Sequence, residues 1–482
     1  MLTIVAFIVA LGSLIAIHEY GHYRVAVACG VKVQRFGIAT FPVPAPEAGK
    51  PASFGHRLAY AITKPVLEWQ PRRQHAGQAT VFAIGLFPLA GYVQMLGQNG
   101  EKDEPSVDAS GDFRNKSVLQ RVAIVAAGPA ANLLLAIFLY SVLNWYGLEE
   151  PKPILGKPVA GSVAQQAGLA GGEIVSAIAF DGSPLEPVES FEEVRWMLTR
   201  GALDSRDVRL AVARDGRTSE TVMRLSNIRA READEKLNRE IGILGPWTEA
   251  VIGDISKGGA AERSGLRKGD VVRAVGVVDV VDAQQLRELI RLSVIDGKGK
   301  SQPWRIERAG VPATIDVQPA PVTDSGKTIG RIEAYVGSPP AMVLVHRGFL
   351  SGLAKGAVRT WDMSTFTLRM IGKMVIGELS LKSLSGPITI AEYAGKSASV
   401  GLIYYLQFLA VLSVSLGVLN LLPVPMLDGG HLMYYLWEGA TGRSVSDAWM
   451  EYLQRAGMAV LLVTMSVALF NDVARQVTRF FG

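Results

Sequence analysis

Four long hydrophobic stretches limit what this 482-residue chain can fold into more than any other feature. They are of spanning length and lie near residues 2 to 17, 118 to 143, 400 to 422 and 456 to 470, and the first continues amphipathically toward Ala28. Hydrophobic residues make up 49% of the chain and charged residues only 19%, so part of it belongs in lipid. The sequence therefore predicts an α-helical membrane protein with four transmembrane helices.

The first hydrophobic stretch resembles a signal peptide only in its position. It has no positive charge ahead of the apolar segment, and His18, Glu19 and His22 follow where a cleavage site would stand. We therefore expect this stretch to be a retained transmembrane helix.

Basic residues next to the first two spans predict the topology. By the positive-inside rule they place the loop between these spans in the cytoplasm. The long middle segment and both chain ends then lie outside the cytoplasm, and the loop from Pro423 to Arg455 returns to the cytoplasmic side. The basic residues are Arg24, Lys32, Arg35, Arg114, Lys116 and Arg121.

The middle segment, about Glu150 to Val322, is polar and Gly-rich and contains an internal repeat. Residues 164 to 175 align with residues 261 to 272: in each, a short helix ends in Gly-Leu and a Gly-acid turn opens a strand. A second helix is predicted after each copy, around 191 to 198 and 284 to 292. The pattern resembles tandem PDZ domains, which are α+β modules that bind extended peptides by strand addition. The alternative is a pair of β modules that only fill space.

The sequence His18-Glu19-Tyr20-Gly21-His22 matches the HExxH pattern at the end of the first span. Histidines four residues apart share a helix face, so both rings can reach one zinc ion. Glu19 is then placed to take a proton from the attacking water and pass it to the leaving amine. The alternative is an interfacial helix end whose histidines only face water. Cys29 is the single cysteine, so neither an internal disulfide nor a Cys-rich metal site is available.

A zinc hydrolase needs a third protein ligand, and Asp428 is the best candidate. It follows the third span in a segment where Pro423 and Pro425 break the helix and two glycines allow a tight backbone path. The four-span topology places it on the same side of the membrane as His22. His431 is a competing ligand three residues further on.

The loop between the first two spans contains Val81 to Phe87, which is apolar but too short to span the membrane. Such a segment suits a re-entrant β-hairpin beside the catalytic cavity, whose edge could add a substrate strand. In the same loop, Leu58 to Trp69 is compatible with an interfacial amphipathic helix. A second membrane-surface region is predicted at Ala354 to Leu379.

Together these motifs resemble the site-2 protease family of intramembrane zinc metalloproteases, along nearly the whole chain. The resemblance rests on HEYGH, the PDZ-like pair, and the segments at 88 to 95, 115 to 121, 126 to 132, 384 to 390 and 420 to 431. It implies one Zn²⁺ held by His18, His22 and Asp428, with Glu19 as base. It also implies substrate contacts, which we assign to Asn420, Pro423, Pro425, Gly91 and Tyr92. Asn420 has the alternative role of a helix cap, and Asn132 either packs between helices or contacts substrate.

For bacterial members of this family, the resemblance implies an inner-membrane protease whose active site faces the cytoplasm and whose PDZ pair is periplasmic. The implied substrates are single-pass membrane proteins: an anti-sigma factor cut after a first protease has removed its periplasmic domain in the stress response, and remnant signal peptides. Membrane lipid is the other partner. A net charge of +5 without interleaved basic and aromatic runs gives no support to a nucleic-acid partner.

Two other functions compete with the protease. One is a non-catalytic PDZ scaffold with a structural metal site. The other is a metal-ion transporter, which the single compact site and the absence of an inverted repeat disfavour.

The predicted domains follow from the assignments above. Their ranges are 1–30 (first span), 31–117 (loop with the hairpin), 118–146 (second span), 150–235 and 236–322 (PDZ-like domains), 323–399 (linker and surface helix), 400–422 (third span), 423–455 (loop with Asp428) and 456–475 (fourth span).

Overall fold

The computed structural model describes residues 1–40, 64–71, 78–85, 91–97, 109–214, 216–228, 235–295, 297–324, 327–378 and 386–481. The chain divides into two compact units, and each is described by itself. Unit 1 comprises Met1–Tyr146, Arg347–Ile376 and Leu384–Phe481, and unit 2 is built on Gly147–His346.

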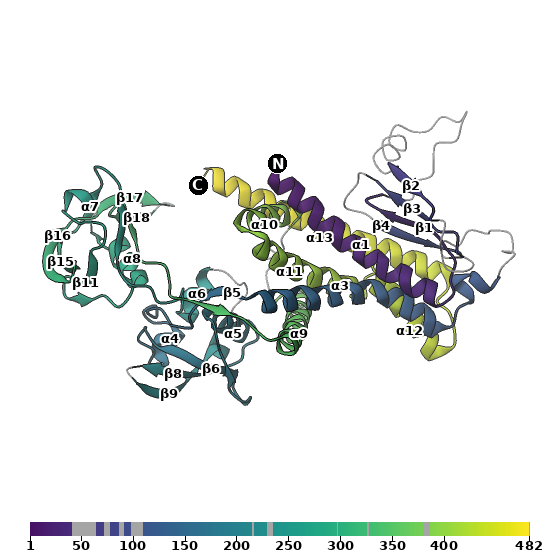
Figure 1. Cartoon of the computed structure of the whole chain (residues 1–482), viewed down its shortest axis with the longest axis horizontal. Helices are drawn as coiled ribbons and strands as arrows, with labels where there is room; N and C mark the ends of the chain where they lie inside the picture. Colours follow the sequence, from purple (N-terminus) through teal and green to yellow (C-terminus); the bar gives the residue numbers. More distant parts are fainter. Residues whose placement is uncertain are drawn as a thin grey trace. The chain divides into compact units, whose positions relative to one another are not determined.

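Unit 1 is a helical bundle with one small sheet (Figure 1). Its helices are α1 (Leu2–Ala28), α3 (Val118–Tyr146), α9 (Phe349–Val375), α10 (Pro387–Val400), α11 (Leu402–Asn420), α12 (Asp428–Thr441) and α13 (Asp447–Phe481). Two short 3₁₀ turns are η1 (Ala109–Gly111) and η2 (Phe113–Asn115). The strands are β1 (Val33–Ile38), β2 (Leu67–Trp69), β3 (Val81–Ile84) and β4 (Gly91–Met95).

Within the described residues, four helices are long and apolar enough to cross a membrane. The four predicted stretches therefore form candidate membrane helices, although the first and fourth helices run further than the apolar pattern alone indicates. They are Leu2–Ala28, Val118–Tyr146, Leu402–Asn420 and Ala448–Val477.

Helix α3 is the central packing partner of unit 1, because α1, α9, α11 and α12 all contact it. Helix α9 packs on α3 through small residues: a Cβ at Gly356 would lie 2.6 Å from Ser141 Oγ. The surface helix predicted at 354 to 379 is thus a helix from Phe349 to Val375. Its place at the membrane surface stays a prediction.

The sheet of unit 1 contains an antiparallel strand pair at the predicted place, because β3 pairs with β2; its position at membrane depth stays a prediction. The full order is β2-β3-β1-β4, so β1 lies between β3 and β4 and pairs with β3 in parallel and with β4 in antiparallel register. The short apolar run at Val81 predicts a strand but cannot show which strands pair with it. The predicted helix from Leu58 to Trp69 is wrong where it can be seen, because Leu67–Trp69 forms β2; residues 58 to 63 lie outside the described residues.

The sheet is fixed against the bundle by a shared hydrophobic core. Buried residues of β1 and β4 pack with the end of α1 and the first half of α3, which brings the start of β4 next to α1. This core comprises Ala26, Val31, Val33, Phe36, Val93, Met95, Phe113, Ile124 and Val125.

Unit 2 contains two lobes with the same sheet order. The first lobe has a four-stranded antiparallel sheet, β7-β6-β8-β9, and the second has β12-β11-β15-β16. The short helices α4 and α7 precede the equivalent strands β6 and β11, and the helices α5 and α8 follow. The internal repeat predicted from the sequence is therefore a repeat of structure. Both predicted second helices exist, as Phe191–Leu203 and Ala283–Arg291.

The first lobe and its neighbours comprise β5 (Leu148–Pro151), α4 (Val163–Gln166), β6 (Ile174–Phe180), β7 (Glu186–Pro187), α5 (Phe191–Leu203), β8 (Val208–Arg214), β9 (Arg217–Met223), η3 (Leu225–Asn227) and α6 (Glu235–Ile241). The second comprises β10 (Ile252–Ile255), α7 (Ala260–Arg263), β11 (Val271–Val275), β12 (Val278–Asp279), α8 (Ala283–Arg291), β13 (Val294–Ile295), β14 (Lys298–Gly299), β15 (Gln302–Arg308), β16 (Val311–Val317), β17 (Ala320–Asp324), β18 (Lys327–Arg331) and β19 (Ala334–Val336), and β20 (Met342–Val345) pairs with β5.

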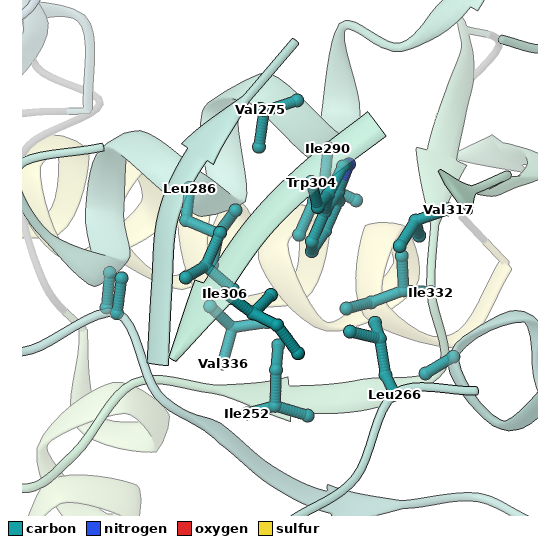
Figure 2. Packing of buried hydrophobic residues seen from close by; sticks show 14 residues of the cluster. Ile252, Leu266, Val275, Leu286, Ile290, Trp304, Ile306, Val317, Ile332 and Val336 are labelled. Carbon is teal, nitrogen blue, oxygen red and sulfur yellow. The ribbon is translucent and has the colours of Figure 1, made fainter. Parts of the chain in front are cut away.

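The second lobe is closed by a single apolar core around Trp304, which is 1% exposed (Figure 2). Helix α8 contributes Leu286 and Ile290 to this core. Ile332 and Val336 also belong to it, so the lobe continues past residue 322, where the sequence pattern placed its end.

Candidate metal centre

The candidate site begins with an unusually close approach of α1 and α3. A Cβ at Gly21 would lie 2.4 Å from the carbonyl oxygen of Ala127, a distance that no side chain tolerates. Small residues at such crossings let two helix backbones approach within a membrane. The glycine inside the HEYGH motif therefore sets how near the histidines come to α3.

His18 and His22 occupy one buried face of α1, and each is 8% exposed. Their Nε2 atoms lie 3.2 Å apart. His22 Nδ1 lies 2.8 Å from the main-chain carbonyl oxygen of Ile124, which makes Nδ1 the protonated nitrogen and leaves Nε2 with a free lone pair. The spacing of four residues thus presents two ring nitrogens to one point, as the sequence predicts.

Asp428 reaches the same point from the other end of the chain. The backbone after α11 folds back tightly: a Cβ at Gly429 would lie 2.1 Å from the carbonyl oxygen of Leu422, and Gly430 is equally confined. This turn places Asp428 in the first turn of α12, with Oδ2 at 3.0 Å from His18 Nε2 and 3.4 Å from His22 Nε2. Among the described residues these three form the only metal-ligating group of this kind, with ligand atoms within 4.8 Å of one another.

The three ligand atoms form a triangle that fits a tetrahedral zinc ion. Zinc–ligand bonds of about 2.0 to 2.1 Å place tetrahedral ligand atoms about 3.3 Å apart, and the three edges here measure 3.0, 3.2 and 3.4 Å. Asp428 Oδ2 has no hydrogen-bond partner apart from these two imidazole nitrogens. Two neutral imidazoles and one carboxylate are also the donor set that catalytic zinc sites use, with a fourth position open.

Gly128 of α3 closes one side of this triangle. A Cβ there would lie 2.2 Å from His22 Nε2 and 2.8 Å from His18 Nε2. Any larger residue would therefore displace the imidazoles. Sequence reasoning missed this contribution of Gly128 and that of the Ile124 carbonyl. The sequence feature that could have indicated a close helix contact here is the run of small residues Ala126-Ala127-Gly128 within an apolar span.

Glu19 is half-buried beside the triangle and faces the sheet. A Cβ at Gly91, the first residue of β4, would lie 2.9 Å from Glu19 Cγ. The edge strand β4 therefore begins directly against the predicted base. Tyr92 packs its ring over Gly37 of β1, where a Cβ would lie 2.4 Å from the ring.

The remaining predicted site residues lie around the turn that carries Asp428. Asn420 is the last residue of α11, and Pro423 and Pro425 lie within the turn itself. Pro425 also contacts α13, because a Cβ at Gly457 would lie 2.4 Å from its carbonyl oxygen. His431 is outside the ligand group and packs edge-on against Tyr434, with ring centroids 6.0 Å apart.

The arrangement of spanning helices, a zinc-ligand triangle and an adjacent carboxylate defines a membrane-embedded metallopeptidase, and comparison with known proteins identifies the family. The model of peptidase family M50 matches residues 6–43 and 64–464, and the chain belongs to this family. A putative zinc metalloprotease of Ralstonia nicotianae is 38% identical over 98% of this chain and 99% of the relative. The regulator of sigma-E protease RseP of Escherichia coli is 34% identical over 98% of both chains, and a protease RseP of Yersinia pestis is 34% identical over the same shares.

Membership of this family confirms the predictions of a site-2-type protease, of an enzyme and of zinc as its metal. Which residues hold the zinc and which carry the reaction stays a prediction.

Proposed function

We propose that this chain hydrolyses peptide bonds within or beside transmembrane segments of single-pass proteins, with one Zn²⁺ held by His18, His22 and Asp428. The observation that carries the proposal is the triangle of ligand atoms, whose edges match tetrahedral zinc, with Glu19 next to it. When bound there, zinc would lower the pKa of an attacking water and polarise the scissile carbonyl.

The side chains then have separate tasks. The carbonyl of Ile124 holds His22 in the tautomer that a ligand needs, and Gly128 keeps space for both rings. Glu19 takes the proton of the attacking water and delivers it to the leaving nitrogen, so no covalent intermediate with the enzyme forms.

The edge strand β4 is the proposed docking site for the substrate. A helical segment must unwind before its peptide bond becomes accessible, and strand addition holds it extended by main-chain hydrogen bonds. The support is the position of Gly91, whose lack of a side chain leaves β4 in contact with Glu19. Tyr92, Asn420, Pro423 and Pro425 are proposed to line this path. That this sheet lies at membrane depth is part of the same proposal.

The two lobes of unit 2 are proposed to be PDZ-like domains on the periplasmic side. Their shared sheet order and the helix between the second and third strands of each sheet support a repeat of that type, and the basic residues around the first loop support the orientation. In this arrangement they screen substrates by the size of the external domain, while the metal site faces the cytoplasmic side of the inner membrane.

The proposed substrates follow from the relatives named regulator of sigma-E protease. By analogy, this chain performs the second cut of an anti-sigma factor in envelope stress signalling, and it removes remnant signal peptides.

The variant Glu19→Gln tests the proposal. Cleavage of a purified single-pass anti-sigma fragment should fall by about 100- to 10,000-fold, the usual contribution of a general base, while each chain keeps one zinc. Product masses and metal content measure the two effects. Glu451→Gln, at a carboxylate whose side chain is 64% exposed, is the matched control and should cleave normally.

The same assay separates the enzyme from a scaffold with a structural metal. In the enzyme, a zinc chelator stops cleavage and added zinc restores it. Undiminished cleavage by Glu19→Gln would refute the role of Glu19, and zinc-loaded wild-type protein that yields no product from several such fragments would favour the scaffold.

A further inference from the structure

Asn132 is a polar residue in the middle of α3 that the proposed reaction does not use. It is 0% exposed. Its main-chain carbonyl accepts a hydrogen bond from Ser413 Oγ of α11 at 2.7 Å. The side-chain Nδ2 lies 3.2 Å from His18 Nδ1, and the side-chain Oδ1 is buried without a hydrogen-bond partner.

An unpartnered amide oxygen in an apolar helix costs free energy, because its contact with water is lost and no hydrogen bond replaces it. The neighbouring His18 gives a reason for the amide to turn when metal binds.

A histidine that binds a metal through Nε2 carries its proton on Nδ1, and that proton needs an acceptor. For His22 the acceptor is the carbonyl of Ile124, on the same helix α3. His18 has the amide of Asn132 at the equivalent place. In the orientation of the structure this amide donates, which suits a His18 whose Nε2 carries the proton toward Asp428.

The amide of Asn132 can form a hydrogen bond with either tautomer of His18, the one protonated at Nε2 or the one protonated at Nδ1. Its terminal torsion is broad and roughly two-fold, so a half-turn exchanges Nδ2 and Oδ1 with little change of shape. After the half-turn Oδ1 accepts a hydrogen bond from His18 Nδ1–H, and Nδ2 takes the position that Oδ1 had. Helix α3 then orients both histidine ligands, one through a main-chain and one through a side-chain acceptor.

We propose that Asn132 is a positioning residue of the zinc site, whose Oδ1 accepts a hydrogen bond from His18 Nδ1–H when the metal is bound. This inference rests on the proposed ligand role of His18. It replaces the two roles that the sequence leaves open for Asn132, helix packing alone and a substrate contact.

The test measures zinc affinity, without activity, on the purified full-length chain in detergent by competition with a chromophoric chelator. Asn132→Leu keeps the volume but removes the acceptor, and we expect zinc to bind 10- to 100-fold more weakly, the usual loss for an outer partner of a ligating histidine. Asn132→Asp keeps an acceptor and should stay within about threefold of wild type or bind zinc more tightly. Ser413→Ala, which touches only the main chain of Asn132, is the matched control and should bind zinc normally.

Melting of the metal-free proteins distinguishes positioning from packing. Wild-type zinc affinity in Asn132→Leu would overturn the inference. The inference would also fail if Asn132→Asp and Asn132→Leu lost zinc affinity equally and in proportion to their loss of stability in the metal-free state. If Asn132→Leu does not accumulate, Asn132→Ala makes the same comparison. If wild type itself binds no zinc, the proposed function fails together with this inference, whereas normal zinc binding by every variant refutes only the role of Asn132.

Discussion

Two aspartates, Asp428 in unit 1 and Asp270 in unit 2, show opposite ways to bury a carboxylate. Both oxygens of Asp270 are satisfied: the guanidinium of Arg308 donates to each at 2.7 Å, and the main-chain N–H of Arg267 donates to Oδ2 at 2.8 Å. Asp428 instead directs Oδ2 at two imidazole nitrogens and has no other hydrogen-bond partner there.

The difference separates a structural carboxylate from a proposed metal ligand. A buried carboxylate with both oxygens hydrogen-bonded holds elements together, as Asp270 joins the turn before β11 to the end of β15. A carboxylate oxygen that lies beside other ligand atoms and has no hydrogen-bond donor is stabilised when a cation binds. We expect the first to govern folding and the second to govern metal binding.

The largest expected effect is that of Asp428→Asn on zinc. A neutral amide is a weaker ligand than a carboxylate, and loss of an outer partner alone costs 10- to 100-fold in affinity, so loss of a ligand should cost more than about 100-fold. Zinc per chain after dialysis against a metal buffer measures the effect. Wild-type zinc content in this variant would contradict the ligand role, and melting of the metal-free protein should change little.

Asp270→Asn should have the converse effect: the zinc content stays normal and the second lobe becomes less stable. Losing a charged hydrogen-bond acceptor at a fully buried position should lower the free energy of opening by about 2 kcal/mol. Hydrogen exchange of the amides in β11 and β15 of the full-length protein measures this locally. The matched variant is Glu173→Gln in the first lobe, where Arg214 lies 3.3 Å away and is 48% exposed, and its effect should be smaller. Equal effects of both variants would contradict the comparison.

The smallest expected effect is the pH dependence of the same lobe. Burial alone would raise the pKa of Asp270, but hydrogen bonds from Arg308 and from the main chain of Arg267 lower it. The folded pKa is therefore below the unfolded value of about 3.9, so its stabilisation is complete above that pH and is lost as the pH falls through the folded pKa. The difference in exchange between wild type and Asp270→Asn should persist down to about pH 4 and shrink below it. If the difference between the two proteins already disappears near pH 6, another titrating group causes the pH dependence.

The sequence was sufficient for the features that have a short period or a short motif. Apolar length predicts the four spans, the spacing of His18 and His22 predicts one shared face, and the repeat predicts two lobes of like topology. Asp428 could be predicted because a catalytic zinc site requires a third ligand on the same side of the membrane.

Pairing and close approach could not be predicted in the same way. The order β2-β3-β1-β4 depends on which strands meet in space, and the apolar run of β3 carries no information about its neighbours. The roles of Gly21 and Gly128 depend on where two helices cross, and a glycine in a span is compatible with many crossings. For Asn132 the sequence offers two roles, and only its distance from His18 supports the third role that we propose.

The order of the ligands along the chain has a consequence for biosynthesis. His18 and His22 leave the ribosome before Asp428, which follows roughly 400 residues later. At 5 to 20 residues per second this interval lasts roughly 20 to 80 s. During that time the nascent chain has only two of the three proposed ligands, so we expect it to have no proteolytic activity until the segment with Asp428 has been made.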